Sequence, residues 1–207
     1  MGVIQRRERE KVEMRQLIVD AAIEMYLKEG YDKLTLRSIA QRIEYAPGTI
    51  YLYFKDKTEL FHAMHEWAFE QLYKKFTAVG AVENALERLR LISYVYVEFA
   101  FDNPELYDLM FILNEPMCAD ANIDEWKCGQ QVFGFLHSTV AQCLELGVIS
   151  GGNADVLSFA FWSSAHGMIS LNLRNRLKMY AVDKRQLIHA AMAAMFQRFV
   201  RPMNSSS

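Results

Sequence analysis

The strongest constraint on the fold of this chain is the stretch TLRSIAQRIEYAPGTIYLYFKDKTEL, residues 35–60. Its apolar spacing predicts one short helix over residues 36–43 and a second over residues 47–53. Proline at position 47 suits the first turn of the second helix, because no backbone N–H is needed there. Residues 44–46 have the length of the turn in a helix-turn-helix. The pattern therefore predicts that motif.

Local chemistry supports the two helices. Thr35 stands where an N-cap is expected, and its hydroxyl can accept a bond from an orphan backbone N–H. Ala40 is small enough for the two helices to cross closely, and a third helix is expected from about Lys57. The space beneath is filled by Leu36, Ile50 and Phe54.

The side chains predicted to face outward carry hydroxyls and positive charges. Such groups contact phosphates and base edges, and exposed tyrosines suit a sugar–phosphate backbone better than a solvated face. A small structural helical hairpin is the alternative interpretation. The candidates for DNA contact are Thr35, Arg37, Thr49, Tyr51, Tyr53, Lys55 and Lys57.

This stretch resembles the DNA-binding domain of the tetracycline-repressor (TetR) family. The resemblance covers about a quarter of the chain and implies an N-terminal DNA-binding unit. The matching residues are Thr35, Arg37, Ile39, Ala40, Gly48, Ile50, Tyr51, Tyr53, Phe54, Lys57 and Leu60.

Two positions depart from the family pattern. Glu44 replaces the usual turn glycine, and a left-handed backbone is unfavourable for glutamate. Ala46 replaces the usual Ser or Thr cap, and alanine is a weak cap. The second helix is therefore expected to fray until DNA orders it.

Composition adds limits but no global sign of nucleic-acid binding. The 207 residues are 52% hydrophobic and 23% charged, which is typical of a globular chain. The net charge of −2 divides weakly, into about +2 for residues 1–57 and −4 for the rest. Arg6, Arg7, Arg9 and Lys11 form a basic arm that either reaches DNA or is a solvated terminus.

Targeting and redox signals point to the cytoplasm. No apolar run reaches the ~18 residues that span a bilayer, and the charged N-terminus does not resemble a signal peptide. Cys118, Cys128 and Cys143 are odd in number and lack CxxC spacing, so they are interpreted as reduced thiols.

The remaining chain predicts further helices, and the fold class is all-α. The expected domains are residues 1–56 for DNA binding, residues 57–202 for ligand binding and dimerisation, and a disordered tail, residues 203–207. Helical ranges are expected at about residues 8–28, 57–77, 82–101, 104–113, 123–146, 153–179 and 183–200, with a loop at residues 118–124.

The family resemblance implies a homodimer formed by the last two long helices. A W-x3-HG pattern at Trp162 and His166 resembles one C-terminal subclass, and small side chains on the final helix permit close approach. Core or interface packing is preferred over a ligand site for His166. The interface candidates are Trp162, His166, Ala190, Ala191 and Ala194.

The resemblance also implies an effector cavity in the C-terminal domain. The aromatic residues there suggest an apolar or amphipathic effector, and Glu98 leaves room for a cation. The same residues could be ordinary core. The candidates are Tyr96, Glu98, Phe111, Trp126, Phe133 and Trp162.

No catalytic motif, cofactor or metal site is predicted. His62 and His65 are spaced for a metal but have no third ligand nearby, so a solvated face is preferred. The main hypothesis is a ligand-responsive, dimeric DNA-binding regulator, most often a repressor in this family, which releases a palindromic operator. The alternative is an all-α enzyme or metal-binding bundle with a coincidental N-terminal motif.

Overall fold

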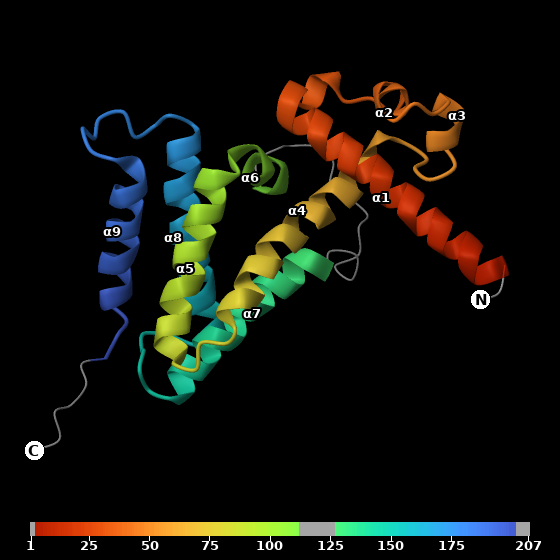
Figure 1. Cartoon of the computed structure of the whole chain (residues 1–207). Coiled ribbons are helices and arrows are strands. Elements are labelled where there is room, and N and C mark those ends of the chain that lie inside the picture. Colours follow the sequence, from red (N-terminus) through yellow and green to blue (C-terminus); the bar gives the residue numbers. More distant parts are fainter. Residues whose placement is uncertain (1–2, 112–126, 202–207) are drawn as a thin grey trace, which may run out of the picture. The chain divides into compact units, whose positions relative to one another are not determined.

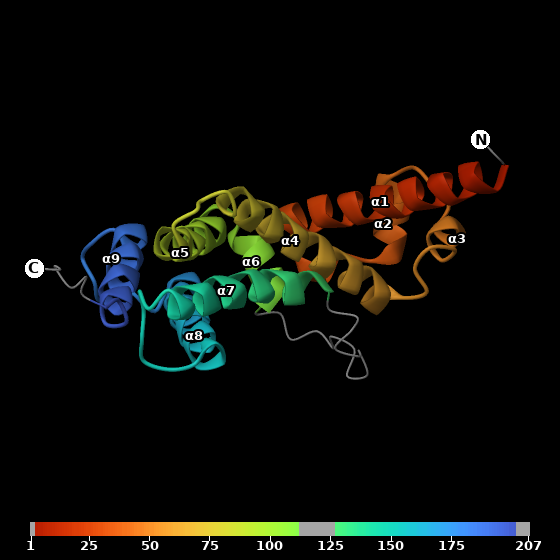
Figure 2. The same cartoon turned by 90° about the horizontal axis from the view of Figure 1, so that it is seen from below.

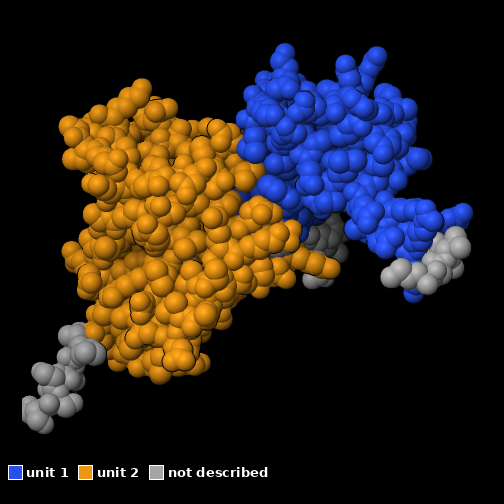
Figure 3. All heavy atoms as spheres, viewed as in Figure 1, with its two compact units in different colours: residues 1–68, 109–125 blue, residues 69–108, 126–207 orange. Residues whose placement is uncertain are grey.

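The computed structural model describes residues 3–111 and 127–201. The chain forms two compact units (Figure 3): residues 1–68 with 109–125, and residues 69–108 with 126–207. We refer to these as unit 1 and unit 2. A functional boundary between residues 56 and 57 stays a prediction.

Regular structure in the described ranges is helical apart from one antiparallel bridge between Ile149 and Val200 (Figure 1), which confirms the predicted all-α class. The elements are α1 (Val3–Glu29), the 3-10 helix η1 (Tyr31–Lys33), α2 (Leu36–Arg42), α3 (Pro47–Ile50), α4 (Lys57–Val79), α5 (Ala85–Asp102), α6 (Pro104–Phe111), α7 (Lys127–Glu145), α8 (Ala154–Leu173) and α9 (Lys184–Gln197).

The helix-turn-helix forms where the sequence predicts it. Thr35 caps α2 by accepting a bond from the Ser38 N–H, and the Ser38 hydroxyl bonds back to the Thr35 N–H. Glu44 adopts the left-handed backbone at φ 60°, as expected at the turn. Ala46 gives α3 no side-chain cap, and α3 ends at Ile50 rather than near residue 53. A four-residue helix without a cap depends on its packing for stability.

Unit 1 has a continuous apolar core. The α1 side chains Ile18 and Ala22 are fully buried, and Glu24 ties α1 to α2 by accepting a bond from Arg42 at 2.7 Å. Hydrogen bonds from Lys28 and then Arg42 lower the pKa of the exposed Glu24 carboxyl. Other buried side chains of this core include Leu34, Leu36, Ile39, Ala40, Ile50, Phe54, Leu60 and Met64.

Unit 2 is a helical bundle in which α5 packs against α7, α8 and α9 (Figures 1 and 2). Asn153 caps α8 and Asp183 caps α9 through side-chain oxygens. Gly147 ends the α7 region with φ 66°, a conformation that favours glycine. The bridge at Ile149 then returns the chain beside the end of α9.

Several predicted helix ends differ from the observed ones. The first helix begins at Val3, five residues before its predicted start, because the charged arm is itself helical. The α8 helix stops at Leu173 instead of continuing to about residue 179, and Asn175 beyond it has φ 54°. The predicted loop at residues 118–124, the residue Trp126 and the tail at residues 203–207 lie outside the described residues.

Candidate nucleic-acid interface and effector site

The outward surface of the helix-turn-helix holds most of the predicted DNA contacts. Arg37 and Lys55 are exposed, Tyr51 is 57% exposed, and Thr49 and Tyr53 are half-buried. No hydrogen bond or ion pair of the Arg37 guanidinium is found within residues 3–111 and 127–201. Arg37 can therefore approach a ligand without losing an internal partner.

Lys57 is held against its own unit. Its ammonium lies 3.5 Å from the centre of the Tyr31 ring and donates to the Tyr31 carbonyl at 3.3 Å. A cation over an aromatic face is worth about 0.5–1 kcal/mol at exposed sites. Lys57 therefore fixes the start of α4 on η1, and any phosphate contact must compete with this packing.

Thr35 and Tyr53 have structural roles in addition to their predicted ones. The Thr35 hydroxyl is already engaged in capping α2. The Tyr53 carbonyl accepts from Arg15 Nη1 at 3.1 Å, and the Arg15 guanidinium also lies 4.1 Å above the Phe54 ring. These contacts join α1 to the segment that follows α3.

Sequence reasoning missed three surface positions around α3. Leu52 is 77% exposed and Tyr45 is 41% exposed, so both side chains lie on the surface near α3. A Cβ added to Gly48 would meet nothing within 4 Å, and its φ lies outside the left-handed region. The fold of this chain therefore does not require glycine there. Leu52 lies beyond the end of α3 at Ile50, so helical spacing alone could not place it beside Gly48.

In unit 2, three of the effector candidates come together with two residues not assigned to that site. Trp162 Nε1 donates to the Tyr96 hydroxyl at 3.2 Å, and that hydroxyl lies 3.1 Å from the Tyr107 hydroxyl. The Tyr107 hydroxyl is in turn 2.6 Å from His166 Nδ1. The Phe133 ring meets the Trp162 ring edge-on, with centroids 6.2 Å apart. We call Tyr96, Tyr107, Trp162 and His166 the polar relay.

Burial controls the protonation of the polar relay. Desolvation raises the pKa of both Tyr96 and Tyr107 far above the usual value, so both hydroxyls stay protonated. Desolvation also lowers the pKa of His166, which favours the neutral imidazole. A neutral ring can accept a hydrogen bond from the Tyr107 hydroxyl at Nδ1. The relay is thus a set of uncharged hydrogen bonds between aromatic side chains.

The other effector candidates do not join this cluster. Glu98 accepts from His189 Nε2 at 2.8 Å and lies 3.2 Å from Arg185 Nη1, and both partners belong to α9. These two residues of α9 pair with the Glu98 carboxylate. Phe111 belongs to unit 1, and Trp126 lies outside the described residues.

The residues predicted to form the dimer interface differ in their exposure to solvent. Trp162 and His166 are half-buried in the polar relay, whereas Ala190 and Ala194 are exposed and Ala191 is half-buried. The α8 surface also exposes Phe159 at 61%. Further exposed residues on α8 at helical spacing are Val156, Ser163, Gly167 and Leu171.

The two histidines on α4 differ in environment. His65 is buried, 5% exposed, and its Nε2 lies 3.0 Å from the Met110 carbonyl, so the preference for a solvated face is wrong for this residue. His62 is half-buried. In the described part of the chain, no group of three His, Cys, Asp or Glu side chains is placed to hold a metal ion. None of the described helices has the length and apolarity to cross a membrane.

Comparison with protein families identifies the class of the chain. The model of bacterial regulatory proteins of the tetR family matches residues 18–64. The model of the tetracyclin repressor-like C-terminal domain matches residues 89–195, more than half of the chain. The chain belongs to the TetR family of bacterial regulatory proteins, as the resemblance predicted.

Similar sequences include named repressors. The chain is 27% identical over 128 residues to the probable acrEF/envCD operon repressor of Escherichia coli (strain K12), and the aligned region covers 58% of each protein. It is 34% identical over 80 residues to the transcriptional repressor KstR of Rhodococcus jostii (strain RHA1), 39% of this chain and 37% of KstR. The chain thus aligns with less than two thirds of either relative. These matches give no support to the enzyme or metal-bundle alternative.

Similar solved structures confirm the fold. A protein of unknown function from Rhodococcus sp. RHA1 has a TM-score of 0.78 at 21% identity, over 90% of this chain and 95% of that one. FadR from Bacillus subtilis, solved in complex with stearoyl-CoA, has a TM-score of 0.69 at 18% identity, over 87% of this chain and 96% of FadR. At these identities the likeness concerns architecture alone.

Proposed function

We propose that this protein is a dimeric, ligand-responsive repressor that binds a palindromic DNA operator through residues 35–57. The observation that carries the proposal is the outward surface of the helix-turn-helix. Cations and hydroxyls gather there around a glycine that its own fold does not require. Such a surface suits a polyanionic partner that approaches the backbone closely.

Roles can be proposed for individual side chains. Arg37 and Thr49 read base edges, since guanidinium and hydroxyl groups suit that task. Tyr51 and Tyr53 contact phosphates and fix the register of the protein on DNA. The remaining contacts are assigned to Thr35 and Lys55, and to Lys57 where it can leave Tyr31.

Dimerisation is proposed through the outer surfaces of α8 and α9. Two-fold symmetry requires a self-complementary patch, and a pair of helices packing on its own copy provides one. Support comes from exposed Phe159 on α8 and from exposed Ala190 and Ala194 on α9. A Cβ at Gly167 meets nothing within 4 Å, so this glycine leaves room for a partner helix.

The effector is proposed to bind beside the polar relay and Phe133. The aromatic walls suit an apolar or amphipathic compound, and the relay offers hydroxyl and imidazole groups for its polar end. Stearoyl-CoA bound to the structurally similar FadR makes acyl-CoA thioesters a reasonable compound class for screening. Binding would tilt α4 and change the separation of the two recognition helices, which lowers operator affinity.

A gel shift with palindromes from the upstream region of its own gene tests DNA binding. Arg37→Ala should relax the preference at one base position and cost about 1–3 kcal/mol on the preferred sequence. Its effect on non-specific DNA should be smaller. Equal binding of operator and scrambled DNA by the unmodified protein would count against the proposal.

A thermal-shift screen of hydrophobic, cationic and acyl-CoA compounds tests the effector site. A true effector raises the melting temperature by mass action and weakens operator binding by the same linkage. Phe133→Ala should have a large effect on the response to the compound. It should have a smaller effect on DNA binding in the absence of the compound. A compound that releases DNA equally well from the Phe133 variant and the parent would move the effector elsewhere.

A further inference from the structure

The N-terminal arm is an extension of α1 rather than a separate tail. The helix begins at Val3, and residues 5–13 are exposed on every side. In Figures 1 and 2 this part of α1 continues past α2 and α3 toward the N-terminus. Burial of the helix begins only at Met14 and Arg15, which are half-buried.

One stripe of α1 changes from apolar to cationic along its length. Arg7, Lys11, Met14, Ile18 and Ala22 follow the four- and three-residue spacing of a single helix face. Ile18 and Ala22 are fully buried in the core of unit 1. The same face therefore packs on the domain at one end and presents Lys11 and Arg7 at the uncovered end.

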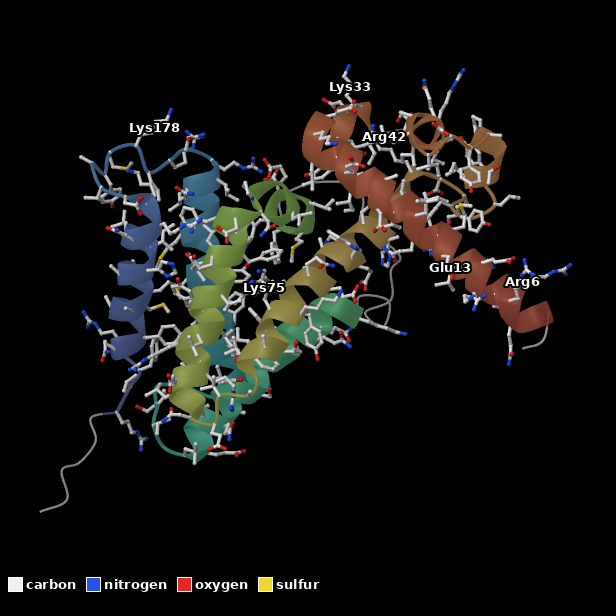
Figure 4. All side chains as sticks on the ribbon, viewed as in Figure 1. Arg6, Glu13, Lys33, Arg42, Lys75 and Lys178 are labelled. Atoms are coloured by element: carbon white, nitrogen blue, oxygen red, sulfur yellow. The ribbon has the colours of Figure 1, made fainter. Side chains whose placement is uncertain are left out.

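Neighbouring charges separate the four cations of the arm into two kinds. Arg6 bonds to Glu10 at 2.7 Å, and Arg9 lies 3.6 Å from Glu13, so both pair on another side of the helix. Figure 4 labels Arg6 and Glu13 on this stretch. Over residues 3–111 and 127–201, neither Arg7 nor Lys11 has a hydrogen bond or an ion pair.

The cationic face is continuous with the proposed DNA surface. At the edge of this face, Arg15 donates to the Tyr53 carbonyl and covers the Phe54 ring, just after α3. At 1.5 Å per residue, Lys11 lies about 6 Å and Arg7 about 12 Å along the axis from Arg15. The row thus extends outward from the segment that carries Tyr51 and Tyr53.

We propose that Arg7 and Lys11 form a second, sequence-independent DNA contact, a row that binds backbone phosphates outside the reach of α3. The inference rests on the proposed DNA binding and adds a docking surface to it. Phosphate is the partner that suits two exposed cations to which the described residues offer no carboxylate. Each engaged cation releases counterions, so the row should be visible in the salt dependence of binding.

Two double variants with equal charge change test the row. The log of the affinity falls as the log of the salt concentration rises. Arg7→Gln with Lys11→Gln should make this fall less steep, by about two units of slope for each bound subunit. The ratio of the parent's DNA affinity to that of this variant should fall about tenfold per subunit between 50 and 200 mM salt. Arg6→Gln with Arg9→Gln is the matched control and should change the slope by much less. Melting temperatures should stay the same, because all four side chains are exposed.

A scan with neutral methylphosphonate linkages locates the contact. Replacing the contacted phosphates should weaken DNA binding by the parent protein. The same replacements should leave DNA binding by the Arg7/Lys11 double variant unchanged. Equal slope changes in the two double variants, or none in either, would overturn the row while leaving operator binding intact. Absence of DNA binding by the parent protein would instead refute the proposed function.

Discussion

The two units of this protein treat their polar side chains in opposite ways. In unit 1 Arg37, Lys55 and Tyr51 are left exposed on the surface around the helix-turn-helix. In unit 2 the Tyr107 hydroxyl and the Nδ1 of His166 are at least partly buried and form a hydrogen bond with each other. Exposed donors without internal partners suit the proposed contact with DNA in unit 1. Buried donors that already bond to one another suit the proposed recognition of a small molecule in unit 2.

The largest expected effect is the loss of the proposed dimer. Ala194→Glu should place an unpaired carboxylate in the proposed α9 seam, where it cannot be solvated. We expect a folded monomer by light scattering and a loss of operator affinity of about 100-fold or more, because bivalent binding is lost. Ala181→Glu, in the exposed connection between α8 and α9, is the control and should stay dimeric. A dimeric Ala194→Glu variant with normal operator binding would falsify this interface.

Two glycines allow the proposed DNA-binding surface to be compared with a surface that faces solvent. Gly48→Ala and Gly134→Ala both add a Cβ that meets nothing within 4 Å. Each should leave stability unchanged or raise it by about 0.5–1 kcal/mol, because alanine favours helix. Only Gly48→Ala should weaken operator binding, by about tenfold. If the two variants bind DNA equally well, close approach at Gly48 is not needed.

Removing one hydroxyl tests whether the polar groups of unit 2 depend on one another. Tyr107→Phe leaves the half-buried Nδ1 of His166 without its donor, at a cost of about 1–3 kcal/mol in unfolding free energy. Tyr94→Phe is the control, since Tyr94 is 50% exposed, and it should change stability by less than about 0.5 kcal/mol. Denaturant unfolding measures both variants. Equal losses would show that the relay has no special contribution.

The smallest expected effect is a loss of stability at mildly acidic pH in both units. Burial is the main cause that lowers the pKa of His65 in unit 1 and of His166 in unit 2. Below about pH 6.5 the unfolded chain binds these protons before the folded chain does. Stability is therefore complete above that pH and falls as the pH drops toward the lowered pKa values, by at most about 1.4 kcal/mol per pH unit and histidine.

Denaturant unfolding at pH 7.5 and 5.5 measures this slope. His65→Gln and His166→Gln should each remove part of it, and His62→Gln is the control in unit 1. An unchanged slope in both variants would show that other groups set the acid sensitivity.

Local signals explain why unit 1 could be predicted so well. The cap at Thr35, the proline at position 47 and the apolar spacing are each read from residues no more than about four positions apart along the chain. The left-handed turn at Glu44 was also predictable, although its residue type argued against it. The contact between Lys57 and Tyr31 could not be predicted, because it joins residues 26 positions apart.

Unit 2 depends on contacts that no local pattern encodes. The Tyr107–His166 and Glu98–His189 bonds join residues 59 and 91 positions apart. Periodicity identified the helices and the aromatic character of the site, but not which face of α5 would meet α9. Glu98 was therefore assigned to the effector, whereas α9 supplies its partners Arg185 and His189.

We propose that residues 35–57 of two subunits together read a palindromic DNA site. The most direct test is an unbiased selection of binding sites from random duplex DNA by the full chain, with Arg37→Ala in parallel. We expect enrichment of two inverted half-sites whose centres lie about 34 Å apart, with one base position relaxed in the Arg37 variant. Selection of no sequence, or of the same sequence with the same stringency by both proteins, would contradict the account.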